Sequence, residues 1–159
     1  MATSQTFQEG PYLLAAIICE KVLVEQGGVK SAIRIIDRVT RQAIGPNPPQ
    51  EMEPFDYETT LLIKFKSGRA RGTYPLEIQL VKPSGESPTP VRQTILFEGE
   101  DDRGIDIVTN MRIRFDQTGI YWFNIILNSV RLTRIPFRVI YLPQVRQMSA
   151  PSGGPPQAR

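Results

Sequence analysis

Alternation of apolar and polar residues along most of the chain predicts β-strands. The pattern is clearest from residue 74 to residue 82, where every second residue is apolar and Glu77 and Gln79 lie between the apolar positions. A period of two places one set of side chains in a buried layer and the other set in water. No run of ten or more residues keeps the spacing of an amphipathic helix, so we expect little helix.

Turn signals separate these extended segments. The segments that we expect to be strands are 12–24, 29–41, 59–66, 74–82, 91–98, 105–115, 120–127 and 130–142. Gly27-Gly28 supplies the positive φ of a hairpin turn between the first two, and Asn128-Ser129 joins the last two as a hairpin. Residues 45–54 must form a surface connection, because their prolines remove backbone donors. Pro136 indicates an edge position or a bulge.

One motif indicates how the strands pack. Asp116-x-x-Gly119-x-Tyr121-x-Phe123 matches the tyrosine corner of immunoglobulin-like sandwiches, in which the tyrosine hydroxyl bonds to upstream backbone. The glycine permits the turn, the aspartate satisfies turn amides, and the tyrosine ring is buried. Phe123 replaces the usual cysteine, in keeping with the absence of a disulfide. We therefore predict an all-β, immunoglobulin-like antiparallel β-sandwich of about seven to eight strands.

The length of 159 residues fits one domain with terminal extensions. We expect a flexible N-terminus over residues 1–10, the sandwich over residues 11–142, and a disordered tail over residues 143–159. The tail contains four prolines, two glycines and few apolar groups. Such a composition buries too little apolar surface to offset the entropy lost on ordering.

Cysteine usage and the N-terminus bear on the compartment. Cys19 is the single cysteine, so it forms no intramolecular disulfide, and its apolar strand favours a small buried hydrophobe over a reactive thiol. The apolar stretch 13–19 is too short to cross a bilayer, and no basic leader precedes it. We expect a cytoplasmic protein that does not engage a membrane.

Three loose patterns link the chain to a known family. They are Cys19-Glu20 at the end of the first strand, the Gly27-Gly28 hairpin followed by Lys30 and residues 33–37, and Gly119-x-Tyr121-x-Phe123 with Pro136-Phe137-Arg138-Val139. On these residues, the chain resembles across residues 12–142 a little-characterised bacterial family of immunoglobulin-like domains of unknown function. The resemblance implies a fold and brings no established activity or site residues.

The residue inventory argues against an enzyme. The chain has no histidine, which removes the commonest general base and metal ligand, and one cysteine cannot build a zinc site. The acidic residues at 98–102, with Asp106 nearby, lack the spacing of an EF-hand loop and are expected to be solvated. Neither adjacent glycine pair lies in a phosphate-binding loop. We predict no catalytic residue, no cofactor and no metal; a hydrolase using paired carboxylates is the weakest alternative.

Charge is distributed unevenly along the chain. The net charge is +3, yet residues 1–102 hold 11 basic and 14 acidic side chains and residues 103–159 hold 8 basic and 2 acidic ones. The candidate contact residues for an anion or a partner are Arg112, Arg114, Arg131, Arg134, Arg138 and Trp122. The simplest interpretation of the arginines is that they occupy ordinary solvent-facing strand positions. Trp122 lies opposite Tyr121 and Phe123, either filling the far side of its strand or marking an exposed apolar patch.

The leading functional hypothesis is a non-enzymatic protein-binding or assembly module with an unknown protein partner. A homodimer is a second arrangement, because both faces of residues 12–18 and 120–127 are apolar. The alternative function is an anion or nucleic-acid binder that uses the C-terminal arginines. Few aromatic residues share their face, which disfavours single-stranded nucleic acid.

Overall fold

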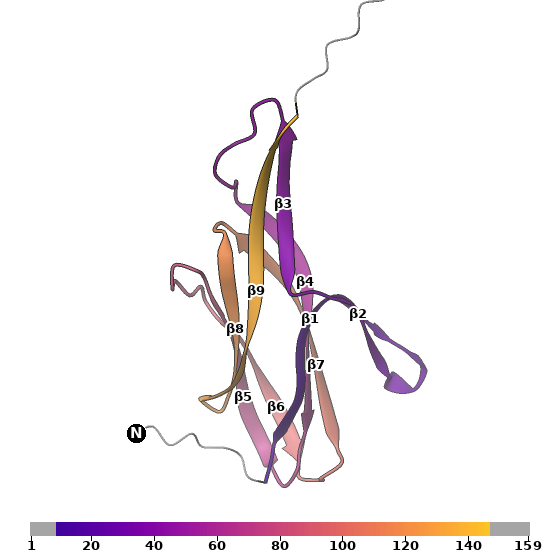
Figure 1. The fold of residues 1–159 in the computed structure, drawn as a ribbon. Helices are drawn as coiled ribbons and strands as arrows, with labels where there is room; N and C mark the ends of the chain where they lie inside the picture. Colours follow the sequence, from indigo (N-terminus) through magenta and orange to yellow (C-terminus); the bar gives the residue numbers. More distant parts are fainter. Residues whose placement is uncertain (1–8, 147–159) are drawn as a thin grey trace, which may run out of the picture.

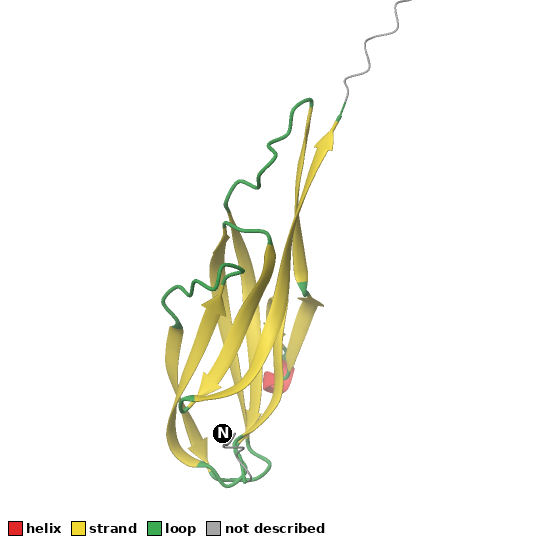
Figure 2. Cartoon of the chain, turned by 60° about the vertical axis from the view of Figure 1, so that its left-hand side comes forward, coloured by secondary structure: helices red, strands yellow, loops and turns green. Residues whose placement is uncertain are grey.

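The computed structural model describes residues 9–146, which form two β-sheets around one shared core (Figures 1 and 2). The strands are β1 (Tyr12–Val24), β2 (Lys30–Ile35), β3 (Arg38–Gly45), β4 (Phe55–Lys66), β5 (Arg71–Val81), β6 (Val91–Glu98), β7 (Gly104–Phe115), β8 (Gly119–Leu127) and β9 (Val130–Val145). A single 3₁₀ turn, Gln26–Gly28, accompanies them in this range. No helix within residues 9–146 is long and apolar enough to cross a membrane.

The first sheet has the strand order β2-β1-β4-β7, and the second has the order β3-β9-β8-β5-β6. All neighbouring strands are antiparallel except β3 and β9, which run parallel with Arg38 beside Arg138 and Gly45 beside Val145. The all-β prediction is confirmed. The strand count of seven to eight was too low, since residues 9–146 contain nine strands, and the sheets are not wholly antiparallel.

The core lies between the sheets and follows the predicted alternation. The largest side chains that are almost fully buried are Tyr121, Phe65, Phe97, Phe115, Phe123, Phe137, Ile18, Leu61, Ile63, Leu76, Ile125 and Leu127. Phe115 joins both layers, because its ring centroid lies 4.8 Å from that of Tyr121 and 5.6 Å from that of Phe137. Full burial of each such side chain stabilises the fold by about 1.5–3 kcal/mol.

The predicted strand 29–41 is wrong as one element, because the chain divides there into β2 and β3. The Ile36 N–H donates to the Ile18 carbonyl at 2.9 Å, which ties the chain back to β1 between the two strands. Arg34 adopts a φ of 52°, where the extended run is interrupted. The side chain of Ile36 packs against the core, and from there β3 passes to the second sheet.

The C-terminal part of β1 forms a hairpin with β2, and this hairpin projects from the edge of the first sheet (Figure 1). Lys30 Nζ lies 3.1 Å from Asp106 Oδ2, and Lys64 Nζ lies 2.8 Å from Asp106 Oδ1, so this carboxylate ties the hairpin to β7 and β4. Burial raises the pKa of Asp106, but the hydrogen bonds from Lys64 and Lys30 outweigh it and hold the pKa below its usual value. Cys19, at the base of the hairpin, is fully buried as predicted, and burial raises the pKa of its thiol.

The tyrosine corner is present as predicted. The Tyr121 side chain is fully buried, and its Oη accepts the N–H groups of Gln117 at 3.0 Å and Asp116 at 3.3 Å. The β8–β9 hairpin also matches the prediction, with positive φ at Asn128 and Ser129. β9 ends at Val145, past the predicted sandwich end at residue 142, because β3 runs beside it. The predicted flexible and disordered segments otherwise fall mostly on residues 1–8 and 147–159, which lie outside the described residues.

Candidate functional site

The outer surface of the second sheet carries the most distinctive side chains, and we call it the Trp122 face. Odd-numbered residues of β8 point into the core, so Trp122 and its even-numbered neighbours point outward. The Trp122 face consists of Ile120, Trp122, Asn124 and Ile126 from β8, Glu77, Gln79 and Val81 from β5, and Arg131, Arg134 and Arg138 from β9.

Trp122 is half-buried on this face, under an arginine. The guanidinium carbon of Arg134 lies 3.9 Å from the centroid of the indole ring, at cation–π distance. Pro136 and Val81 are the cross-strand neighbours of Trp122 on its two sides. The aromatic ring is therefore held against its own sheet while part of it remains accessible.

Asn124 lies next to Trp122 on the same face and contains a polar atom without a partner. Its side chain is 6% exposed, and its Nδ2 donates to Gln79 Oε1 at 3.0 Å. Its Oδ1 is buried and has no hydrogen-bond partner among the described residues. Leaving such an acceptor unsatisfied costs about 1–3 kcal/mol.

The Trp122 face has a surplus of positive charge. Within residues 9–146, no carboxylate lies within 4.0 Å of the side-chain nitrogens of Arg131, Arg134 or Arg138. Two further arginines border the face but are neutralised: Arg38 pairs with Asp37 at 3.0 Å and Arg92 pairs with Glu77 at 2.9 Å. Three guanidinium groups therefore remain available to an acidic partner.

The other two candidate arginines lie elsewhere. Arg112 and Arg114 are on β7 and point outward from the first sheet, since Ile113 between them is buried. Both contact Asp56, at 2.8 Å and 3.6 Å respectively. The hydrogen bond from Arg112 lowers the pKa of Asp56 and keeps this carboxylate ionised. The structure thus separates the five predicted arginines into two that share the Asp56 carboxylate and three that have no carboxylate within 4.0 Å in residues 9–146.

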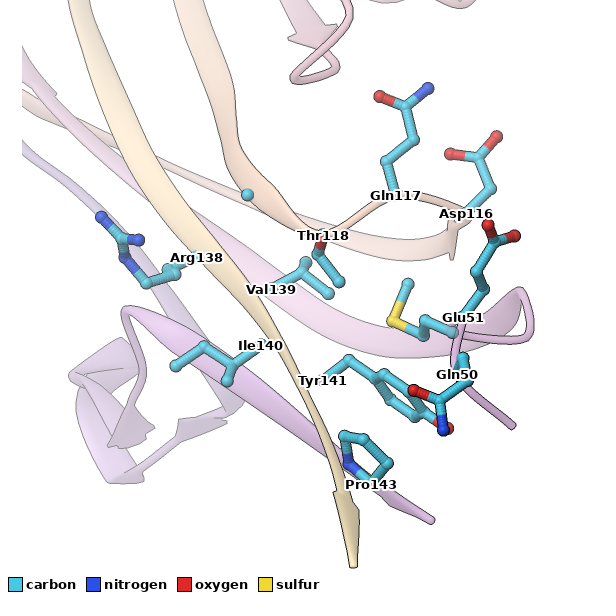
Figure 3. A pocket seen from close by; sticks show the side chains of 12 residues that line it. Gln50, Glu51, Asp116, Gln117, Thr118, Arg138, Val139, Ile140, Tyr141 and Pro143 are labelled. Carbon is cyan, nitrogen blue, oxygen red and sulfur yellow. The ribbon is translucent and has the colours of Figure 1, made fainter. Parts of the chain in front are cut away.

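A hollow of about 800 Å³ lies at the end of the Trp122 face, where β8 begins and β9 continues past it. We call it the notch. It is lined by residues 138–141 and Pro143 of β9, by residues 116–119, and by residues 50–52 of the proline-rich connection. Figure 3 shows β9 running along the notch, with Thr118 and Val139 towards one end and Tyr141 and Pro143 towards the other. Arg138 therefore belongs to both features.

The ionisable groups of residues 9–146 show no acid–base pair. The carboxyl groups whose pKa departs from the usual value all have it lowered, and they are Asp37, Asp56, Asp106 and Asp116. The cause at Asp116, for example, is a hydrogen bond from Lys82 at 2.7 Å. A general acid working near neutral pH needs the opposite shift. No three His, Cys, Asp or Glu side chains of residues 9–146 are placed to hold a metal ion.

Comparison with known proteins assigns the chain to a family. A family model described as a family of unknown function, DUF6941, matches residues 14–140. The chain belongs to the DUF6941 family. The match covers β2 to β8 completely and most of β1 and β9, so it includes the Trp122 face and most of the notch. No curated protein matches this DUF6941 chain.

Sequence reasoning found Trp122 and the three available arginines but missed Asn124 and the notch. An asparagine at an outward position of a strand gives no sign that its neighbours will bury it. The notch arises because β9 extends beyond the residues that pair with β8. Pro143, which we took as the start of the tail, lies inside β9, so the predicted end of the strand at residue 142 was too early.

Proposed function

We propose that this chain is a non-enzymatic protein-binding module that docks an acidic protein surface on its Trp122 face. The observation that carries the proposal is the combination of a half-exposed Trp122 under Arg134 with basic neighbours that have no acidic partner in residues 9–146. Tryptophan and arginine are the residue types most enriched where binding energy concentrates in protein interfaces.

An immunoglobulin-like sandwich is the fold that we propose for this module. Three features support it: the tyrosine corner at Tyr121, the two-sheet arrangement, and the passage of the N-terminal region from one sheet to the other, where β3 pairs in parallel with the last strand. The open face of a sheet in such a sandwich offers a broad, rigid surface. A rigid surface binds a protein partner without losing much conformational entropy.

The charge pattern favours a different protein over a second copy of this chain. A two-fold symmetric dimer through the Trp122 face would bring the same patch against itself, and Arg134 and Arg138 would approach like charges. Glu77, an acidic side chain on this face, is already paired with Arg92. An acidic partner instead supplies the carboxylates that Arg131, Arg134 and Arg138 lack. A homodimer thus becomes an outcome for the test to exclude.

Site-specific photo-crosslinking in cells tests this function. A photoreactive amino acid at Val81, the cross-strand neighbour of Trp122, should capture a partner that the same group at Val108, on the outer side of the first sheet, does not. The captured protein is then purified and its affinity measured by the fluorescence of Trp122, which is the single tryptophan of the chain. Trp122→Ala, followed by calorimetry, should weaken binding by about 2 kcal/mol, or roughly 30-fold.

Arg134→Ala and Arg112→Ala form a matched pair for this experiment. Both remove an exposed arginine from a strand, but only Arg134 lies on the Trp122 face. We expect weaker binding for Arg134→Ala and unchanged binding for Arg112→Ala. Equal affinities for the wild type and for the Trp122 and Arg134 variants would refute the proposal. Fluorescence anisotropy with DNA, RNA and polyphosphate at low salt tests the alternative function, for which steep salt dependence is expected.

A further inference from the structure

The notch exposes an unpaired strand edge. β8 begins at Gly119, which lies opposite Val139, whereas β9 continues to Val145 with β3 on its other side. The N–H groups of Arg138 and Arg146 donate to carbonyls of Asp37 and Gly45, both at 2.9 Å, so even-numbered residues of β9 direct their backbone groups towards β3. Successive residues of a strand direct these groups to opposite sides. The backbone groups of Tyr141 and Pro143 therefore face the notch, and those of Val145 lie on the same free edge of β9, beyond the lining residues.

The wall of the notch is held in place by the chain itself. The Tyr141 hydroxyl donates to the carbonyl of Pro49 at 2.7 Å, which fixes the proline-rich connection beside β9. Pro48 in that connection is buried, and Met52 packs against the core. The opposite end is closed by Thr118 at the start of β8. A preformed slot of this kind loses little conformational freedom when a ligand enters.

We infer that the notch binds an extended peptide segment of another protein, which adds to β9 as an antiparallel strand in line with β8. An extended chain is the ligand whose alternating N–H and C=O groups match those of Tyr141 and Val145. The side chains of the peptide that point inward would contact Met52 and Tyr141, so we expect apolar residues at these positions of the peptide. A carboxylate on its outward side would meet Arg138, which has no acidic partner in residues 9–146.

Pro143 explains why the segment should not come from a second copy. Proline has no N–H, so at this position β9 offers the notch a carbonyl but no donor. The β9 edge of a second copy would bring its own Pro143, and two edges that each lack this donor would leave carbonyl groups unpaired. A peptide of different sequence supplies an N–H to the Pro143 carbonyl and completes the ladder.

Peptide selection combined with amide exchange tests this inference on the full chain. A display library of random dodecapeptides is selected against the protein, and hydrogen exchange is measured by NMR with and without each enriched peptide. In the free protein the amides of Tyr141 and Val145 should exchange faster than those of Ile140 and Leu142, which face β3. An enriched peptide should protect the Tyr141 and Val145 amides. The idea fails if the library yields no peptide that protects them.

Val145→Pro and Val145→Ala provide the matched variants. Val145 is 70% exposed and its N–H lies on the free edge of β9, away from β3, so proline removes one donor that the β3 ladder does not use. Loss of one hydrogen bond should weaken the peptide about fivefold to tenfold, whereas Val145→Ala should bind normally. Equal affinities for the two variants would overturn the inference. Because this site shares Arg138 with the Trp122 face but does not include Trp122, Trp122→Ala should leave peptide binding intact even where the proposed function fails.

Discussion

The hydroxyl of Tyr121 should be the most stabilising single polar group in the fold, and Tyr121→Phe removes it without changing the ring. The hydroxyl accepts two backbone N–H groups, from Gln117 and Asp116, and lies 3.2 Å from Asp116 Oδ1 and from the Gln117 carbonyl. Removal leaves two donors without this acceptor. Each buried, unsatisfied group costs about 1–3 kcal/mol, and since water reaches the half-buried turn, we expect a total near 2 kcal/mol.

Equilibrium unfolding in urea measures this loss. With a slope of about 2 kcal/mol per molar urea, typical of a domain of this size, the midpoint should fall by roughly 1 M while the slope stays unchanged. Tyr74→Phe is the matched control, because the Tyr74 ring contacts that of Phe97 at 5.2 Å and its hydroxyl makes no hydrogen bond to any of residues 9–146. If both variants shift the midpoint equally, the corner does not stabilise the fold through its hydroxyl.

The pH dependence gives a second check on the same group. Burial raises the pKa of Tyr121 above its usual value, so the folded state favours the neutral phenol. The unfolded chain then ionises first, and the stability that Tyr121 contributes is present below a pH of about 10 and is lost as the pH rises further. The difference in stability between the wild type and Tyr121→Phe should therefore narrow in alkaline solution.

Further predictions concern the hairpin, two turns and the core. Asp106→Asn should expose the β1–β2 hairpin to trypsin at neutral pH. Because its pKa is lowered, Asp106 stabilises the folded state while its carboxyl group is ionised, so the hairpin of the wild type should loosen in the same way as the pH falls below about 4. Gly68→Ala should lower the thermal midpoint more than Gly27→Ala: both have positive φ, but a Cβ at Gly68 meets a backbone oxygen at 2.5 Å and one at Gly27 meets nothing within 4 Å. Phe115→Ala should cost about 3–5 kcal/mol in urea unfolding, whereas Leu14→Ala, at an exposed position, should cost little.

Local alternation predicted most strands because a strand with one buried face shows its period directly in the sequence. The division between β2 and β3 was missed at Ile35 and Ile36, where two adjacent isoleucines break that period. Ile35 is 65% exposed, while Ile36 packs against the core, so the break marks the point at which the chain changes sheets. The parallel pairing of β3 with β9 joins segments about a hundred residues apart, and no local pattern encodes it.

The grouping of arginines on the Trp122 face depends on an irregularity that the sequence conceals. Strict alternation would place Arg131 and Arg134 on opposite sides of β9, since one position is odd and the other even. A register shift in the β8–β9 ladder pairs Ile125 with Thr133 but Ile126 with Arg131, so one residue of β9 is extra. This bulge returns Arg131 to the side of Arg134 and still leaves Phe137 facing the core.

The three prolines within the strands lie just beyond the ends of neighbouring strands. The backbone groups of Pro75 point towards the β8 side, because its carbonyl accepts the Asn128 N–H at 2.9 Å. The pairing of β5 with β8 ends at Leu76, so no β8 residue lies opposite the N–H that Pro75 lacks. Pro136 directs its nitrogen to the β3 side, two residues before β3 begins to pair at Arg138. Pro143 directs its nitrogen into the notch. At all three positions the N–H that proline lacks would have faced no neighbouring strand, so proline costs the ladders nothing there and blunts an edge that could otherwise aggregate. At the notch, the neighbouring N–H groups of Tyr141 and Val145 remain, which is the arrangement expected if that edge is closed to identical chains and open to a peptide of another sequence.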